Sequence, residues 1–152
     1  MKQVIDISKV LAAVLLCALG TANHKSRAQE ISVDSLNFYT IENCVNTFSK
    51  EGSVDTKTGY QYWFADKDFL DGRTLKLSVV APNRSTHAPH KHPEDEFFFI
   101  LEGRASFYLD GKSVEVGPYT SLYCPSNSMH GISNTGETDL KYLVIKKYEN
   151  SK

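Results

Sequence analysis

The chain has 152 residues, and its 17 lysines and arginines nearly balance its 18 aspartates and glutamates, which gives a formal net charge of −1. Acidic and basic residues are interspersed, with no block of like charge longer than Glu94-Asp95-Glu96. This balance argues against a nucleic-acid-binding protein, which needs a clustered basic surface, and it indicates no electrostatic partner.

Residues 1–28 have the pattern of an export signal. A positively charged start is followed by Val10–Leu19, an unbroken run of apolar and small residues, which is too short for a bilayer span of about 20 residues. Small residues at the positions that a signal peptidase reads favour cleavage after Ala28, with cleavage after Ala22 as the alternative. The sequence therefore predicts an exported protein, periplasmic or secreted, that begins at Gln29 and has no membrane segment.

The predicted mature chain has 124 residues, of which 13 are basic and 17 acidic. That length suits one domain. Residues 29–58 mix apolar residues with turn formers and are predicted to be an N-terminal extension that contains an edge strand or a short helix. The domain itself is predicted over 59–152.

From Gly59 onward the sequence consists of short runs rich in Val, Ile, Phe, Tyr and Leu, each ended by a turn signal. This pattern is typical of an all-β protein, and many short strands at close spacing favour a sandwich or a barrel. Asp110-Gly111 is the strongest hairpin signal. The predicted strands are 60–65, 74–81, 96–102, 105–109, 112–116, 121–124, 129–133 and 140–147.

Residues 97–101 form a continuous apolar run, Phe-Phe-Phe-Ile-Leu. In a strand, such a run predicts that both faces are covered. One face fills the interior, and the other is expected to lie under the N-terminal segment or in a homodimer interface.

The histidines are clustered. His87, His90 and His92 fall within six positions, and His130 is the only other histidine after residue 28. Side chains alternate across a strand, so we expect His90 and His92 to project from one face of a strand. A turn at 93–95 then places the carboxylate of Glu96 at the start of the next strand, where it can join the two imidazoles.

These residues resemble the two motifs of the cupins. The first motif has a His-x-His pair, a Glu four residues later and a Gly seven further on; the second has Pro, Gly, His and Asn at fixed spacing. The matching positions here are His90, His92, Glu96 and Gly103, and then Pro125, Asn127 in place of Gly, His130 and Asn134. Tyr119 stands where the second motif opens with Gly.

The resemblance covers about residues 74–147. It implies a double-stranded β-helix, or jelly-roll barrel, with His90, His92, Glu96 and His130 as metal ligands at its open end and Gly103 closing a hairpin. Imidazole and carboxylate suit one divalent Mn, Fe, Ni, Zn or Cu ion, and such a ligand set leaves coordination positions open. His87 lies outside the motif and is predicted to be a loop histidine at the mouth rather than a fifth ligand.

The cysteines of the predicted mature chain, Cys44 and Cys124, lie beside apolar residues. They are expected to be small buried side chains, and the alternative is a disulfide formed in an oxidising compartment.

Two classes of function fit these features. The first is a metal-dependent enzyme acting on a small polar molecule, carbohydrate-derived in one version, as an isomerase, lyase or dioxygenase. The alternative is a binding module that holds a small ligand or a metal without turnover. The two classes differ by a proton-transfer group that is not a ligand, for which His87, Tyr123 and Arg84 are the candidates. A cysteine hydrolase that uses Cys124 and His130 is a third hypothesis.

Overall fold

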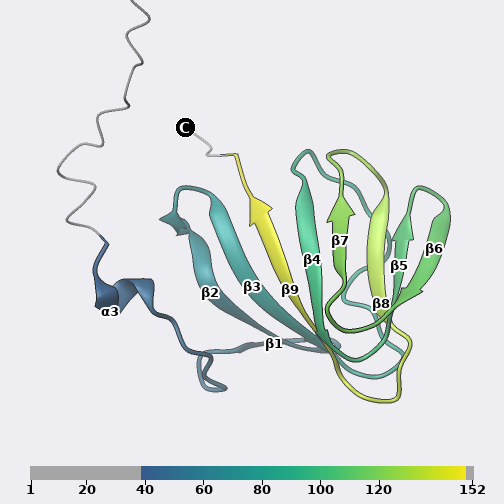
Figure 1. Cartoon of the computed structure of the whole chain (residues 1–152), viewed down its shortest axis with the longest axis horizontal. Coiled ribbons are helices and arrows are strands. Elements are labelled where there is room, and N and C mark those ends of the chain that lie inside the picture. Colours follow the sequence, from purple (N-terminus) through teal and green to yellow (C-terminus); the bar gives the residue numbers. More distant parts are fainter. Residues whose placement is uncertain (1–38, 150–152) are drawn as a thin grey trace, which may run out of the picture. The chain divides into compact units, whose positions relative to one another are not determined.

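The computed structural model describes residues 39–149 (Figure 1). The predicted signal peptide, 1–28, and the first part of the predicted extension, 29–38, lie outside the described residues. Backbone contacts divide the chain into two units, 1–40 and 41–152, and every described strand belongs to the second. Within 39–149 no helix has the length and apolar character needed to cross a membrane.

The described residues are almost entirely β-structure, as the sequence predicts. One short helix and one short strand, α3 and β1, precede the remaining strands. The elements are α3 (Ile41–Cys44), β1 (Val54–Thr56), β2 (Gly59–Leu70), β3 (Arg73–Val80), β4 (Glu96–Glu102), β5 (Ala105–Leu109), β6 (Lys112–Val116), β7 (Ser121–Cys124), β8 (His130–Asn134) and β9 (Leu140–Lys147). The largest boundary error is in β2, which continues past the predicted end at residue 65 through two register shifts.

The strands form two antiparallel sheets. One has six strands in the order β1-β2-β3-β9-β4-β7, and the other has three in the order β6-β5-β8 (Figure 1). Strands distant in the sequence lie side by side, because β9 fills the place between β3 and β4. This arrangement confirms the predicted jelly-roll barrel.

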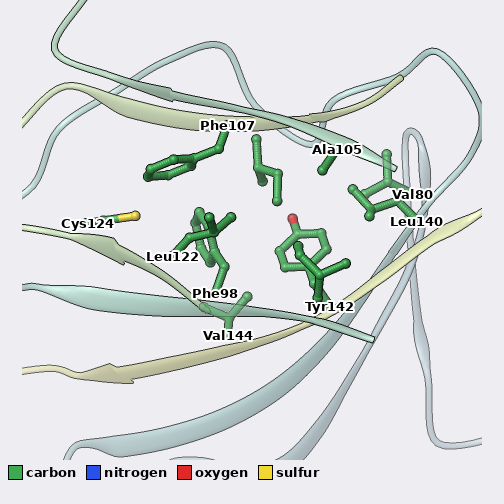
Figure 2. Packing of buried hydrophobic residues seen from close by; sticks show 11 residues of the cluster. Val80, Phe98, Ala105, Phe107, Leu122, Cys124, Leu140, Tyr142 and Val144 are labelled. Carbon is green, nitrogen blue, oxygen red and sulfur yellow. The ribbon is translucent and has the colours of Figure 1, made fainter. Parts of the chain in front are cut away.

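The hydrophobic core lies between the two sheets. Figure 2 shows Phe98, Leu122 and Tyr142 from the large sheet packed toward Phe107 and Ala105 from the small one. Because side chains alternate across a strand, the even-numbered residues of β3, β4 and β9 face this interior. Burial of these apolar side chains is the main driving force for closing the two sheets on each other.

Among the described residues of the single chain nothing covers the second face of the apolar run in β4 at Phe97, which is 42% exposed. Phe97 pairs across the sheet with Tyr123 and Ile145, which are exposed as well. Its ring centroid lies 4.8 Å from that of Tyr123, so these side chains partly shield one another without a covering layer. A homodimer interface on this face stays a prediction.

The turns bear out one hairpin and correct another. Leu109 pairs with Lys112 across Asp110-Gly111, and the two turn residues have φ of 44° and 89°, as a two-residue type I′ hairpin requires. Gly103, by contrast, does not close a hairpin, because β4 and β5 belong to different sheets. Its turn instead carries the chain from one sheet to the other.

The two cysteines differ from each other. Cys124 is buried, as predicted, whereas Cys44 is exposed, and both are free thiols. The exposure of Cys44 follows directly from its position at the end of α3, a helix of four residues with no buried side chain.

Gly103 and Gly111 offer a matched test of the corner between the sheets. Their φ angles are nearly equal, 90° and 89°, but a Cβ on Gly103 would lie 2.8 Å from the Asp139 carbonyl oxygen, whereas a Cβ on Gly111 meets nothing within 4 Å. Gly111→Ala should therefore lose only the roughly 1–2 kcal/mol of a left-handed residue. Gly103→Ala should lose about 1–3 kcal/mol more through overpacking. Urea unfolding of both variants measures this, and equal losses would contradict it.

Candidate metal centre

The structure brings together His90, His92, Glu96 and His130. One ligand atom from each of the four lies within 4.8 Å of the other three. The Glu96 Oε1 atom lies 3.0 Å from the His130 Nε2 atom and 3.5 Å from the His92 Nε2 atom. The four residues singled out in the sequence thus form one cluster.

His90 and His92 do not lie on a strand, so that part of the prediction is wrong. They belong to the irregular segment 81–95 between β3 and β4. Pro89 and Pro93 flank the pair and have no N–H group, which prevents a regular ladder. The segment is instead joined to β8 at two isolated points, Ser85 opposite Ser133 and His90 opposite His130. At the second point the His90 N–H donates to the His130 carbonyl at 2.9 Å, and the His130 N–H donates to the His90 carbonyl at 2.8 Å.

The turn before β8 holds the other histidine of the pair. The Asn127 N–H donates to the His92 carbonyl at 2.8 Å, and the Ser126 hydroxyl donates to the Pro93 carbonyl. Asn127 has a φ of 61°, a conformation that Asn adopts more readily than most residues other than Gly. Tyr119, at the other position where the motif has Gly, also has a φ of 61°.

Backbone carbonyls orient the three imidazoles. The Nδ1 atoms of His90, His92 and His130 lie 3.1, 2.7 and 2.9 Å from the carbonyl oxygens of Ala88, Glu94 and Ser128. A carbonyl oxygen can only accept a hydrogen bond, so each Nδ1 carries the proton. In a neutral ring each Nε2 then keeps a lone pair, as a metal ligand needs.

This protonation pattern is a test of whether the residues fit a metal ion. The Glu96 carboxylate and the His130 Nε2 atom are both acceptors, and at 3.0 Å they need a proton or a cation between them. Glu96 is 7% exposed and His130 is 0% exposed, so water cannot readily satisfy either of them. Three imidazole nitrogens and one carboxylate suit a divalent transition metal with open positions. The residues therefore fit such an ion.

A cavity of about 160 Å³ opens beside the four residues. Polar groups of Ser78, Thr86 and Tyr142 and apolar groups of Phe98 and Ile132 are part of its wall. The Tyr142 hydroxyl lies 3.4 Å from the Thr86 hydroxyl, and burial raises the pKa of Tyr142, so this phenol stays protonated. The cavity thus has both polar and apolar walls and carries a hydrogen-bond donor.

Of the three proton-transfer candidates, only His87 is among the residues that line this cavity. Burial, together with the nearby His90 and Lys76, lowers the pKa of His87, so its ring is neutral at neutral pH. The hydroxyl of Tyr123 instead donates to the Asp95 carboxylate at 3.2 Å. His87 lies beside the four-residue cluster without belonging to it, as the sequence predicts.

Two lysines that the motif does not include also line the cavity. Lys76 on β3 and Lys146 on β9 occupy inward-facing positions, and burial lowers the pKa of Lys76, an effect that the Glu96 charge partly opposes. The sequence held a signal for the first: Thr74, Lys76, Ser78 and Val80 share one face of a strand, and a lysine there is unusual.

The structure argues against Cys124 as the nucleophile of a cysteine hydrolase. Burial, with a smaller contribution from the Glu96 charge, raises the pKa of the Cys124 thiol to about 12. A thiol is a nucleophile only as its thiolate, so Cys124 is inert at neutral pH. His130, moreover, is held by Glu96 and the Ser128 carbonyl.

Comparison with known proteins places these features in one family. Residues 76–146 match the family model Cupin_2, described as a cupin domain. Residues 76–146 form a cupin domain. The matched segment contains all four clustered residues and both cavity lysines.

Individual relatives differ in what their names say of them. The oxalate-binding protein of Thermotoga maritima is 37% identical over 72 residues, which is 47% of this chain and 60% of the relative. A solved structure from the same organism, described as a predicted oxalate decarboxylase, has a TM-score of 0.55 at 27% identity and covers 58% of this chain and 78% of its own. Quercetin 2,3-dioxygenase of Bacillus subtilis is 30% identical over 61 residues, or 40% of this chain and 18% of the relative. The matched part of this chain spans 60%, 53% and 39% of the lengths of three curated relatives.

Removal of single ligands should abolish metal binding. His92→Ala and Glu96→Ala each take one donor from a four-donor site, and we expect both variants to lose stoichiometric metal while the barrel remains folded. His87→Ala is the matched control, because it removes an imidazole that lines the same cavity without belonging to the cluster. Elemental analysis after metal loading, with circular dichroism as the check on folding, makes the measurement. Full metal content in both ligand variants would refute the assignment.

Proposed function

We propose that this cupin is a metal-dependent enzyme that acts on a small polar molecule, as an isomerase, lyase or dioxygenase. The observation that carries the proposal is the convergence of three imidazoles and one carboxylate at a cavity that also holds groups able to move protons. A divalent metal at these donors would polarise a carbonyl or hydroxyl group of the substrate, or lower the pKa of bound water.

The residues around the donors have separate roles in this proposal. The neutral imidazole of His87 can accept a proton, whereas the protonated phenol of Tyr142 can donate a hydrogen bond. Phe98 and Ile132 exclude water from the inner part of the cavity. A pure binding site has no need of a proton acceptor beside the metal, so His87 favours the enzyme over the binding module.

The alternative is a module that binds a small ligand without turnover. It is supported by the similarity to a protein named for oxalate binding. Similarity to a quercetin dioxygenase supports the enzyme. Over the same fold, a likeness to a putative sugar phosphate isomerase from Acidithiobacillus ferrooxidans, with a TM-score of 0.60 at 19% identity over 72% of this chain and 78% of that one, shows the architecture alone.

Metal loading followed by turnover assays tests the proposal. The purified protein, produced without a histidine tag, is reconstituted in parallel with Mn, Fe, Ni, Zn and Cu, and bound metal is counted by elemental analysis. We expect near-stoichiometric binding and a rise in the unfolding temperature. A ligand that binds only the folded state at 100 times its Kd stabilises that state by about 2.7 kcal/mol. Each loaded form is then incubated with small hydroxy acids, keto acids and sugar derivatives, and products are detected by NMR.

The outcomes separate the two functions. Turnover that is lost in Glu96→Ala supports the enzyme, and a further loss in His87→Ala with unchanged metal content assigns the proton transfer. Saturable binding without product supports the binding module. Absence of stoichiometric metal from all five reconstitutions would overturn the metal-dependent enzyme and leave the binding module.

We also propose that the protein is exported. The support is the charged and apolar pattern of residues 1–28. Mass spectrometry of the protein recovered from the periplasm or the medium of an expressing bacterium should find an N-terminus at Gln29. An N-terminus at Asn23 would instead support the alternative cleavage after Ala22. Retention of residues 1–22, or of the protein in the cytoplasm, would contradict the proposal.

A further inference from the structure

The strand register directs two lysines and one carboxylate into the same part of the barrel. Lys76 on β3 is paired across the sheet with Val144 on β9, which is paired in turn with Phe98 on β4. In the next row toward the open end, Lys146 on β9 is paired with Glu96. All of these residues line the 160 Å³ cavity. Two ammonium groups therefore face the space beside the four donors.

The two lysines differ in how their charges are balanced. The Lys146 Nζ atom lies 3.5 Å from a carboxylate oxygen of Glu94. Lys76 has no carboxylate within 4.0 Å of its Nζ atom in the described part of the chain. On one side it is covered by the ring of Trp63, whose centroid is 5.0 Å from the Nζ atom. A partly buried cation without an anionic partner destabilises a protein. An anionic ligand beside the Lys76 ammonium would offset this cost.

The charge of the metal-loaded site points in the same direction. Glu96 is the only carboxylate among the four donors, so a divalent ion bound there leaves an excess of one positive charge. Lys76 adds a second, whereas Lys146 and Glu94 cancel. An anion that reaches both the metal and the Lys76 ammonium would neutralise this excess.

The size of the cavity and the side chains that line it narrow the choice of anion further. The cavity is smaller than the roughly 300–1,000 Å³ of sites for drug-sized ligands. No arginine is among the described residues that line it, although arginine forks are favoured where phosphate is bound. Val144, Phe98 and Ile132 supply an apolar wall for a short carbon skeleton.

Resting on the proposed metal site, we infer that the ligand is a small carboxylate that bridges the metal and the ammonium of Lys76. In this arrangement one polar end of the ligand would meet the Lys76 ammonium and the other would occupy the open coordination positions of the metal. The carbon atoms between them would lie against the apolar wall. Lys76 is then the residue that selects an anion over a neutral polyol of the same size.

Calorimetric titration of the zinc-loaded protein tests this inference without relying on turnover. The probes are oxalate, malonate and glycolate, with malonamide as the uncharged counterpart of malonate. Lys76→Met removes the charge and keeps most of the length of the side chain. Lys147→Met is the matched control, since Lys147 is an exposed lysine on β9 that is not among the residues lining the cavity. Zinc content is measured before and after each titration, so that removal of the metal by the probe is detected.

We expect the wild-type protein to bind at least one carboxylate and to ignore malonamide. Lys76→Met should weaken that binding by roughly tenfold to a hundredfold, the range for loss of a hydrogen bond to a charged group, with zinc content unchanged. Lys147→Met should bind as the wild type does. Equal carboxylate binding by Lys76→Met and wild type, or no binding of any carboxylate by the zinc-loaded wild type, would overturn the inference and leave the metal site standing. Failure of the wild type to retain any of the five metals would instead overturn the proposed function itself.

Discussion

The site depends on one pair of backbone hydrogen bonds, those exchanged between His90 and His130. The segment 81–95 contains two prolines beside its histidines and cannot pair as a regular strand, yet it must hold two imidazoles within reach of a third. A reciprocal pair fixes both the distance and the relative direction of the two residues that make it. Because His130 also begins β8, the pair connects the irregular segment to the small sheet and, through Glu96 on β4, to the large one.

A second constraint follows from placing acceptors in a closed interior. Four groups with free lone pairs would repel one another in an apolar barrel, and the carbonyls that hold the Nδ1 protons remove the simplest remedy, which is a change of tautomer. A metal ion would satisfy all four at once, and the barrel supplies a frame that keeps the four residues in place. The apolar cluster around Phe98, Ile100 and Tyr142 therefore has two roles. It stabilises the fold, and it raises the free-energy cost of leaving the four acceptor groups without a cation.

The sequence predicted the features that depend on the local spacing of residues, but not those that depend on which strands pair with each other. The strand composition, the Asp110-Gly111 hairpin and the cluster of four residues were readable because each depends on residues close in the chain or on a known motif. The exposure of Phe97 and the corner at Gly103 were not, because both depend on which strands become neighbours. Lys146 was missed for the same reason: its place opposite Glu96 comes from the pairing of β9 with β4, two strands that are far apart in the chain. Lys76 was visible only as one charged residue in an inward-facing row.

The donors and the lysines are held in different ways, and this separates metal binding from ligand choice. His90, His92 and His130 are fixed by hydrogen bonds to the backbone, so their geometry is set by the loop and the turn. Lys76 and Val144 project from the middle of a continuous ladder between β3 and β9, where a change of side chain leaves the backbone hydrogen bonds in place. A barrel of this kind can keep its metal while the inward positions of β3 and β9 change the charge and shape of the cavity. Under the proposed function, the reaction would be decided by the residues facing the metal across the cavity rather than by the fold.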